Sequence, residues 1–155
     1  MKKVLILESN EAFARELSEY FAREGYTVCG VTGDGAQGLS LIEKNVPCVV
    51  VTSLLLTSLD GFTVMERAKK AGLKADFVVL GNFSDDKIVS RVIALGARYY
   101  LMKPVSAEIV EERVAELSQE DAPSPAREKL ERRRAGSLDE RISNIFVSIG
   151  IPPNI

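Results

Sequence analysis

The sequence predicts an α/β fold, with a five-stranded parallel sheet and helices on both of its faces. Short apolar runs alternate with segments of helical periodicity, as consecutive right-handed β-α-β units require. The runs at residues 49–51 and 77–80 are apolar at successive positions, which is typical of strands buried on both faces. The chain has 155 residues, of which 46% are hydrophobic, enough for the core of one domain of ordinary size.

Each predicted strand is a short run rich in Val, Ile, Leu or Tyr. These runs cover residues 3–7, 26–31, 48–53, 76–81 and 98–102. The intervening segments place apolar residues three or four positions apart, on one face of a helix. The first such stripe is Phe13, Leu17 and Phe21, and it follows Asn10, a preferred N-cap residue. A second stripe is Ile88, Val92 and Leu95, and a third is Ile109, Val110, Val114 and Leu117.

The composition changes near the C-terminus. Residues 119–136 contain two prolines and the charged stretch Arg127–Arg134, and we expect a linker there. Residues 137–155 begin with Ser137 and Glu140 at capping-box spacing, which predicts a further helix. Its apolar stripe consists of Leu138, Ile142, Ile145, Phe146 and Ile149.

Charge and composition exclude several classes of function. A net charge of −2 argues against a chain built around contacts with a polyanion. No apolar run approaches the roughly 20 residues of a membrane span, and no signal-peptide core is present, so we expect a cytoplasmic protein without membrane contact. The chain has no histidine, which excludes histidine catalysis and histidine metal sites. Cys29 and Cys48 lie in strand-like runs, and we expect both to be unpaired core residues.

Three predicted strands end in residues that carry chemistry. Glu8 follows the first strand, Ser53 ends the third, and Lys103 follows the fifth. The C-terminal ends of parallel strands meet in one crevice, the usual place for a functional site. An acid and a lysine that flank an aspartate would form a pocket that accepts a phosphoryl group. Here a serine stands where the aspartate would be.

A glycine motif after the second strand needs a separate interpretation. Gly33, Gly35 and Gly38 match the spacing of a dinucleotide-binding turn. However, such a turn belongs after the first strand, and Ser53 stands where the ribose-binding acid would be needed. We therefore expect flexible turn glycines and a tolerated helix glycine.

Four segments together resemble the receiver domain of two-component response regulators over residues 1–118. They are Glu8-Ser9-Asn10, Leu59-Asp60-Gly61, Gly81-Asn82-Phe83-Ser84, and Lys103-Pro104 with Tyr100 three positions before the lysine. The resemblance implies a flavodoxin-like sheet in the order 2-1-3-4-5. It also implies a regulatory domain and not an enzyme.

The resemblance assigns roles to five positions. It implies an acidic pair at Glu8 and Ser9, a phospho-acceptor at Ser53, a hydroxyl residue at Gly81, and the lysine at Lys103. Only Glu8 and Lys103 keep the expected chemistry, so the pocket is degenerate.

The same resemblance bears on the metal. Receivers bind Mg²⁺ through the acidic pair, the acceptor carboxylate and a backbone carbonyl, which falls at Leu55 here. One of three carboxylates remains, namely Glu8, and Mg²⁺ requires near-octahedral oxygen ligation. We therefore expect no cofactor and the loss of the metal site.

The remaining site residues have simple alternative interpretations. The Ser53 hydroxyl would need a base such as Glu8 before it could attack, and otherwise it only fills space. Lys103, without an aspartate, needs another anion, for which Glu8 is the nearest candidate. Tyr100 lies where receivers carry a switch aromatic whose rotamer follows the hydroxyl residue lost at Gly81. Alternatively, Tyr100 is a packed strand aromatic.

The C-terminal residues resemble the start of the DNA-binding domain of the stage-zero class of sporulation transcription regulators. Residues 59–61, 96–97 and 99–104 resemble the receiver of that class. The implied function is a phosphorylation-independent regulatory input or dimerisation module. Expected partners are a second copy, through residues 84–117, and phosphorelay or sporulation regulators, with DNA bound only by a domain outside this sequence. The alternatives are a receiver phosphorylated by an unusual route, or a small nucleotide or flavin binder.

Overall fold

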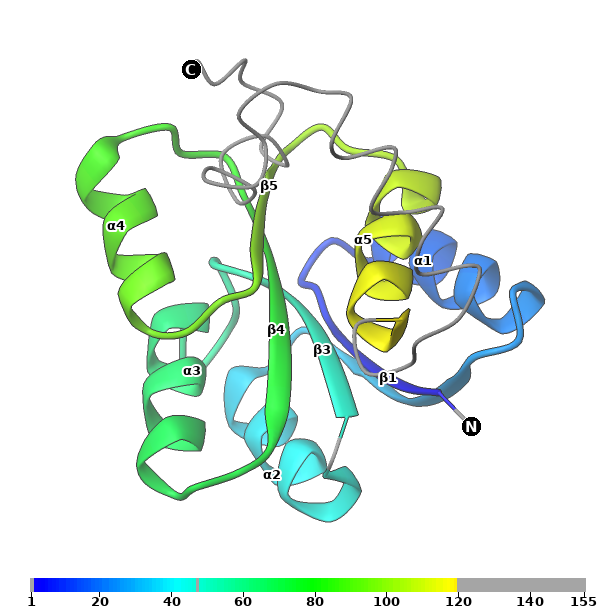
Figure 1. Cartoon of the computed structure of the whole chain (residues 1–155), viewed down its shortest axis with the longest axis horizontal. Coiled ribbons are helices and arrows are strands. Elements are labelled where there is room, and N and C mark those ends of the chain that lie inside the picture. The colour runs from blue at the N-terminus through cyan, green and yellow to red at the C-terminus, as the bar shows by residue number, and fades with distance from the viewer. Residues whose placement is uncertain (1, 47, 120–155) are drawn as a thin grey trace.

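The computed structural model describes residues 2–46 and 48–119, and these form one α/β domain around a parallel sheet (Figure 1). The strands are β1 (Lys3–Leu7), β2 (Thr27–Thr32), β3 (Cys48–Ser53), β4 (Ala75–Gly81) and β5 (Tyr99–Met102). They pair in parallel in the order β2-β1-β3-β4-β5, which confirms the predicted sheet.

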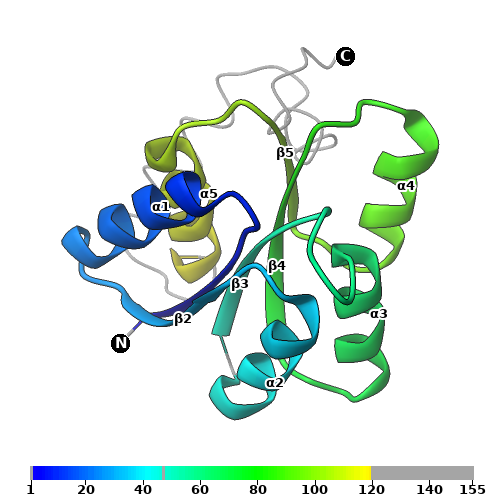
Figure 2. The ribbon, with the colours of Figure 1, turned by 180° about the vertical axis from the view of Figure 1, so that it is seen from behind.

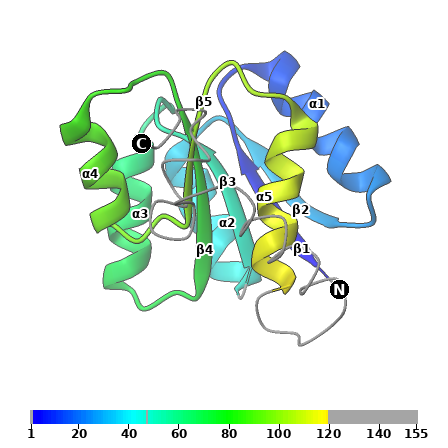
Figure 3. The same cartoon turned by 45° about the horizontal axis from the view of Figure 1, so that its top comes forward.

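The helices are α1 (Glu11–Arg23), α2 (Gly35–Asn45), α3 (Gly61–Lys70), α4 (Asp86–Ala94) and α5 (Ala107–Gln119). Side-chain oxygens at the N-caps of α1 to α4 accept hydrogen bonds from backbone N–H groups of the first turn, and Asn10 is the cap of α1, as expected. Helices α1 and α5 lie on one face of the sheet, whereas α2, α3 and α4 lie on the other (Figures 2 and 3).

Alternate residues of the strands fill two cores. In β1, Leu5 and Leu7 join the cluster beneath α2, α3 and α4, whereas Val4 and Ile6 join the cluster beneath α1 and α5. All four side chains are fully buried. Ile109, which the sequence placed in the apolar stripe of α5, remains 36% exposed and lies outside these clusters.

The two cysteines are unpaired, as expected. They lie on β2 and β3, which are separated in the sheet by β1. Burial raises the pKa of the Cys48 thiol to about 11, so this thiol stays protonated at neutral pH.

The glycines after β2 have a role that the sequence analysis did not predict, because they allow close contacts. A Cβ atom at Gly35 would lie 1.9 Å from the Leu59 carbonyl oxygen, and one at Gly33 would lie 2.9 Å from the Ser9 Cα. A Cβ at Gly38 would lie 2.8 Å from the Leu7 side chain. The Thr57 N–H donates to the Gly33 carbonyl at 2.9 Å, so the loops after β2 and β3 are joined beside Ser9.

The predicted linker and C-terminal helix lie outside the described residues, apart from Gln119, which ends α5. No helix of the described part of the chain is both long and apolar enough to cross a membrane.

Candidate functional site

The ends of β1, β3 and β5 bring Glu8, Ser53 and Lys103 into contact. The Ser53 hydroxyl donates a short hydrogen bond to Glu8 Oε1. Lys103 Nζ lies 3.0 Å from Glu8 Oε1 and 3.2 Å from Glu8 Oε2, so the ammonium contacts both carboxylate oxygens. The ion pair expected from the sequence is therefore present.

The Glu8 carboxylate is buried, and its partners within the protein replace water. Its side chain is 1% exposed, whereas that of Lys103 is 21% exposed. The backbone N–H of Asn10 donates to Oε2 at 3.0 Å and adds a third partner. A buried carboxylate is stable only with a counter-charge and hydrogen bonds, and these three residues supply both.

The oxygen donors at the strand ends do not fit Mg²⁺. Ser9 contributes a hydroxyl in place of a carboxylate, and this hydroxyl donates to the Leu55 carbonyl at 3.1 Å. That carbonyl is the remaining backbone ligand implied by the resemblance. Glu8 provides one carboxylate, which already binds an ammonium. Within residues 2–46 and 48–119, no three acidic, cysteine or histidine side chains are grouped as a metal site would need.

Gly81 and Tyr100 form a second feature of the site, which sequence reasoning missed. Tyr100 is fully buried, and a Cβ atom at Gly81 would lie 2.4 Å from its hydroxyl oxygen. That hydroxyl donates to the Phe83 carbonyl at 2.6 Å and accepts from the Phe83 N–H at 3.2 Å. The tyrosine therefore occupies the space that any side chain at position 81 would need.

Burial also keeps the Tyr100 hydroxyl in its neutral form. It raises the pKa of Tyr100 above its ordinary value, although the hydrogen bond to the Phe83 backbone acts in the opposite direction. The neutral hydroxyl can donate and accept at the same time, as both contacts with Phe83 require. The loop after β4 is thus fixed to β5.

A hollow of about 260 Å³ lies over these residues. Its lining includes Glu8, Ser9, Ser53, Gly81 and Lys103, so all five positions assigned from the sequence share one site. The exposed side chains of Leu55 and Phe83 also line it. The ionised groups of this lining are Glu8 and Lys103, whose charges cancel.

The sequence analysis did not predict a buried polar cluster on the face of the sheet that α1 and α5 cover. The Tyr99 hydroxyl donates a short hydrogen bond to Glu116, and Arg113 Nη1 lies 2.7 Å from the same carboxylate. Glu116 is 6% exposed. The i,i+3 spacing of Arg113 and Glu116 was the available signal, but a charged pair on a helix more often indicates a solvated face.

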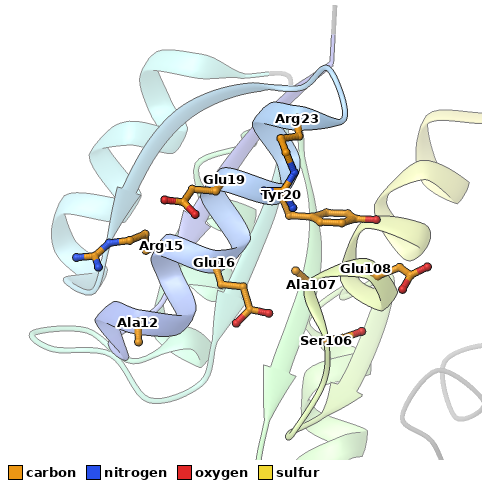
Figure 4. Close-up of a pocket in the computed structure, with 9 residues that line it drawn as sticks. All are labelled: Ala12, Arg15, Glu16, Glu19, Tyr20, Arg23, Ser106, Ala107 and Glu108. Carbon is orange, nitrogen blue, oxygen red and sulfur yellow. The ribbon is translucent and has the colours of Figure 1, made fainter.

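A larger hollow, of about 360 Å³, lies between α1 and the start of α5 (Figure 4). Its lining includes Glu16, Glu19 and Tyr20 from α1 and Glu108 from α5. None of the site residues assigned from the sequence lines it.

Comparisons with known proteins agree with this fold. The sequence matches the pattern of the family described as the response regulator receiver domain over residues 4–115. It is 29% identical over 108 residues to the probable C4-dicarboxylate response regulator DctR of Bacillus subtilis, covering 68% of this chain and 47% of that protein. It is also 25% identical over 115 residues to the chemotaxis protein CheY of Treponema pallidum, covering 73% and 80%.

One solved structure illustrates the likeness of fold. The signal receiver domain of the putative response regulator NarL from Mycobacterium tuberculosis has a TM-score of 0.72 at 20% identity, covering 77% of this chain and 97% of that one. At 20% sequence identity, this likeness shows the fold alone. The chain spans about half the length of the DctR relatives that it matches.

Proposed function

The chain belongs to the response regulator receiver domain family, and on that premise we propose that it is a regulatory module that works without phosphorylation of its strand-end pocket. One observation supports this proposal above the others. The pocket is already filled by an internal network, in which Glu8 binds Lys103, Ser53 and the Asn10 N–H.

The charge balance of the network argues against a phosphoryl group. A phosphoryl group on Ser53 would carry at least one negative charge beside the buried Glu8 carboxylate. Lys103, the cation in the pocket lining, is already paired with Glu8. The donor set does not fit Mg²⁺, so the added charge would have no counter-ion and would cost free energy.

The arrangement of Tyr100 supports the same function. A receiver that lacks a hydroxyl residue at position 81 has lost the group expected to link phosphorylation to this tyrosine. Here both backbone groups of Phe83 hold the Tyr100 hydroxyl, and the ring fills the space above Gly81. The surface of α4, β5 and α5 would then be presented in one fixed form, to a second copy through residues 84–117 or to another regulator.

A second candidate function is phosphorylation by an unusual route, and one contact favours it. The Ser53 hydroxyl donates to Glu8, as a nucleophile does to a general base. In that reaction the Ser53 oxygen would bond to phosphorus, Glu8 would take the hydroxyl proton, and the bond to the donor's leaving group would break. Ser53 is only 2% exposed, and the Glu8 carboxylate also serves the Lys103 ammonium, which makes this candidate the weaker one.

The wider biological role is proposed from the resemblance. We assign the chain to a regulator of the sporulation type, in which residues 119–136 link the receiver to a DNA-binding domain that begins near Ser137. Phosphorelay or sporulation regulators would be its partners. Of the residues that support this assignment, 59–61, 96–97 and 99–104 lie in the described part of the chain, whereas those from 137 onward lie outside it.

Intact mass spectrometry after incubation with acetyl phosphate and Mg²⁺ separates the two candidate functions. We expect no adduct on the 155-residue chain, because the pocket lacks an acceptor carboxylate. A gain of one phosphoryl group, about 80 daltons, would contradict the proposal, provided that the Ser53→Ala variant fails to gain it. An adduct that persists in Ser53→Ala would place the modification elsewhere and leave the pocket unphosphorylated.

A further inference from the structure

The hollow between α1 and α5 has a chemistry that the receiver function does not use. In Figure 4, the Tyr20 side chain extends from α1 toward α5, with Glu16 and Glu19 on one helix and Glu108 on the other. Glu16, Glu19 and Glu108 are exposed, and Tyr20 is partly exposed. A ring flanked by carboxylates from two helices suits a cation with a flat apolar face, such as a guanidinium.

The electrostatic environment of this hollow is negative. After burial, the charges of Glu24, Glu108, Glu111 and Glu112 are the next causes that raise the pKa of Tyr20. All four carboxylates therefore act on the ring. The lining itself carries three carboxylates, Glu16, Glu19 and Glu108, against the two cations Arg15 and Arg23, and Glu24, Glu111 and Glu112 act on the Tyr20 ring from outside the lining.

Tyr20 already contacts one guanidinium from its own helix. The Arg23 guanidinium carbon lies 5.4 Å from the centroid of the Tyr20 ring, within the range of a cation–π contact. This arginine comes from the same helix, and the Tyr20 ring extends beyond it toward α5 in Figure 4.

The sequence contains a segment with the complementary charge. Residues 127–134 carry three more positive than negative charges, from Arg127, Lys129, Arg132, Arg133 and Arg134 against Glu128 and Glu131. The segment follows α5 closely, since that helix ends at Gln119. An extended chain from there to residue 131 spans about 40 Å, about twice the length of α5, so the segment can reach the start of this helix.

We propose that the basic segment 127–134 docks in the hollow between α1 and α5 of the same chain. Its arginines would pair with the exposed carboxylates and with the partly exposed Tyr20 ring. Because the segment is tethered, the docking is intramolecular and needs only weak individual contacts. While docked, the same cations are withheld from phosphate groups of a polyanion. The proposal does not depend on the state of the strand-end pocket.

Paramagnetic relaxation tests this contact in the full-length chain. A nitroxide label is placed at Ala135→Cys in a Cys29→Ser background, and backbone amide signals are compared with those of a diamagnetic label. We expect strong broadening at residues 12–23 of α1 and at residues 106–108, which lie at the start of α5, a full helix length from Gln119. Broadening should decline as ionic strength rises from about 0.1 M to about 1 M, because the Debye length shortens from about 10 Å to about 3 Å.

Two matched variants and one mixing experiment complete the test. Each of two multiple variants should reduce the broadening at residues 12–23 to the level seen on α3. One removes cations from the segment (Arg132→Gln/Arg133→Gln/Arg134→Gln), and the other removes carboxylates from α5 (Glu108→Gln/Glu112→Gln). Equal broadening on α1 and α3 in the spin-labelled chain without these substitutions would overturn the proposal. Broadening that the two variants leave unchanged would overturn it as well. In the mixing experiment, spin-labelled chains are added to isotope-labelled chains that carry no spin label, and the signals of the isotope-labelled chains should not broaden. Broadening only in that mixture would assign the hollow to a second copy instead.

Discussion

Replacing Glu8 with alanine should lower the free energy of unfolding by about 3 kcal/mol, the lower end of the range for removing one partner of a buried charge pair. The change leaves the Lys103 ammonium without its counter-ion and the Ser53 hydroxyl and Asn10 N–H without their acceptor. Lys103 is 21% exposed, so water can hydrate it in part, which limits the loss. Urea unfolding of the wild type and of Glu8→Ala measures the difference.

Two further variants separate charge from hydrogen bonding. Glu8→Gln keeps the volume and one acceptor oxygen, and it should lose about half as much stability as Glu8→Ala. In the Lys103→Met background, Glu8→Gln should cost less than it does in the wild type, because the two side chains interact directly. Equal urea midpoints for the wild type and Glu8→Ala would show that the pair does not stabilise the domain.

Gly81→Thr should destabilise the domain by about 2–4 kcal/mol, because the new side chain and Tyr100 cannot occupy the same space. The threonine Cβ would lie 2.4 Å from the tyrosine hydroxyl oxygen. We expect Tyr100 to leave the interior, with the loss of both hydrogen bonds to Phe83 and of buried aromatic area. Urea unfolding measures the stability, and sedimentation shows whether the altered surface of α4, β5 and α5 changes self-association.

The Tyr100→Ala background supplies the control for this prediction. The cavity left by the ring can accommodate the threonine, so Gly81→Thr should be nearly neutral there. A cost of Gly81→Thr that is the same with and without the tyrosine would show that the glycine is needed for another reason. The structure also implies that restoring a hydroxyl at position 81 alone cannot restore a receiver, because the tyrosine must move first.

The strands and the ion pair could be predicted because they follow from local patterns. Apolar runs fix which residues are strands, and a parallel sheet brings strand ends together, so Glu8 and Lys103 meet although 95 positions separate them. The packing of Gly81 against Tyr100 depends on the register of β4 and β5, in which Val79 lies opposite Tyr100, and on the rotamer of the ring. Neither can be read from the sequence of a single strand.

The role of the glycines after β2 escaped prediction for a related reason. Gly35 looks like an ordinary turn residue until Leu59, from the loop after β3, is placed against it. Glu116 has the sequence context of an exposed helix residue, and only the position of Tyr99 on the neighbouring strand explains its burial. In both cases the determining contact is tertiary, and a periodic pattern along one element cannot show it.

The response to beryllofluoride, an anion that takes the place of a phosphoryl group, tests most directly whether the internal network has replaced phosphorylation. Backbone amide spectra are recorded while beryllofluoride is added in the presence of Mg²⁺, with Mg²⁺ and fluoride alone as the reference. The Ser9→Asp/Ser53→Asp variant, which restores two carboxylates beside Glu8, serves as the comparison. For the unmodified chain we expect no saturable change at Ser53, Phe83 or Tyr100. A saturable change centred on Ser53 that extends to Tyr100 would contradict phosphorylation-independent function.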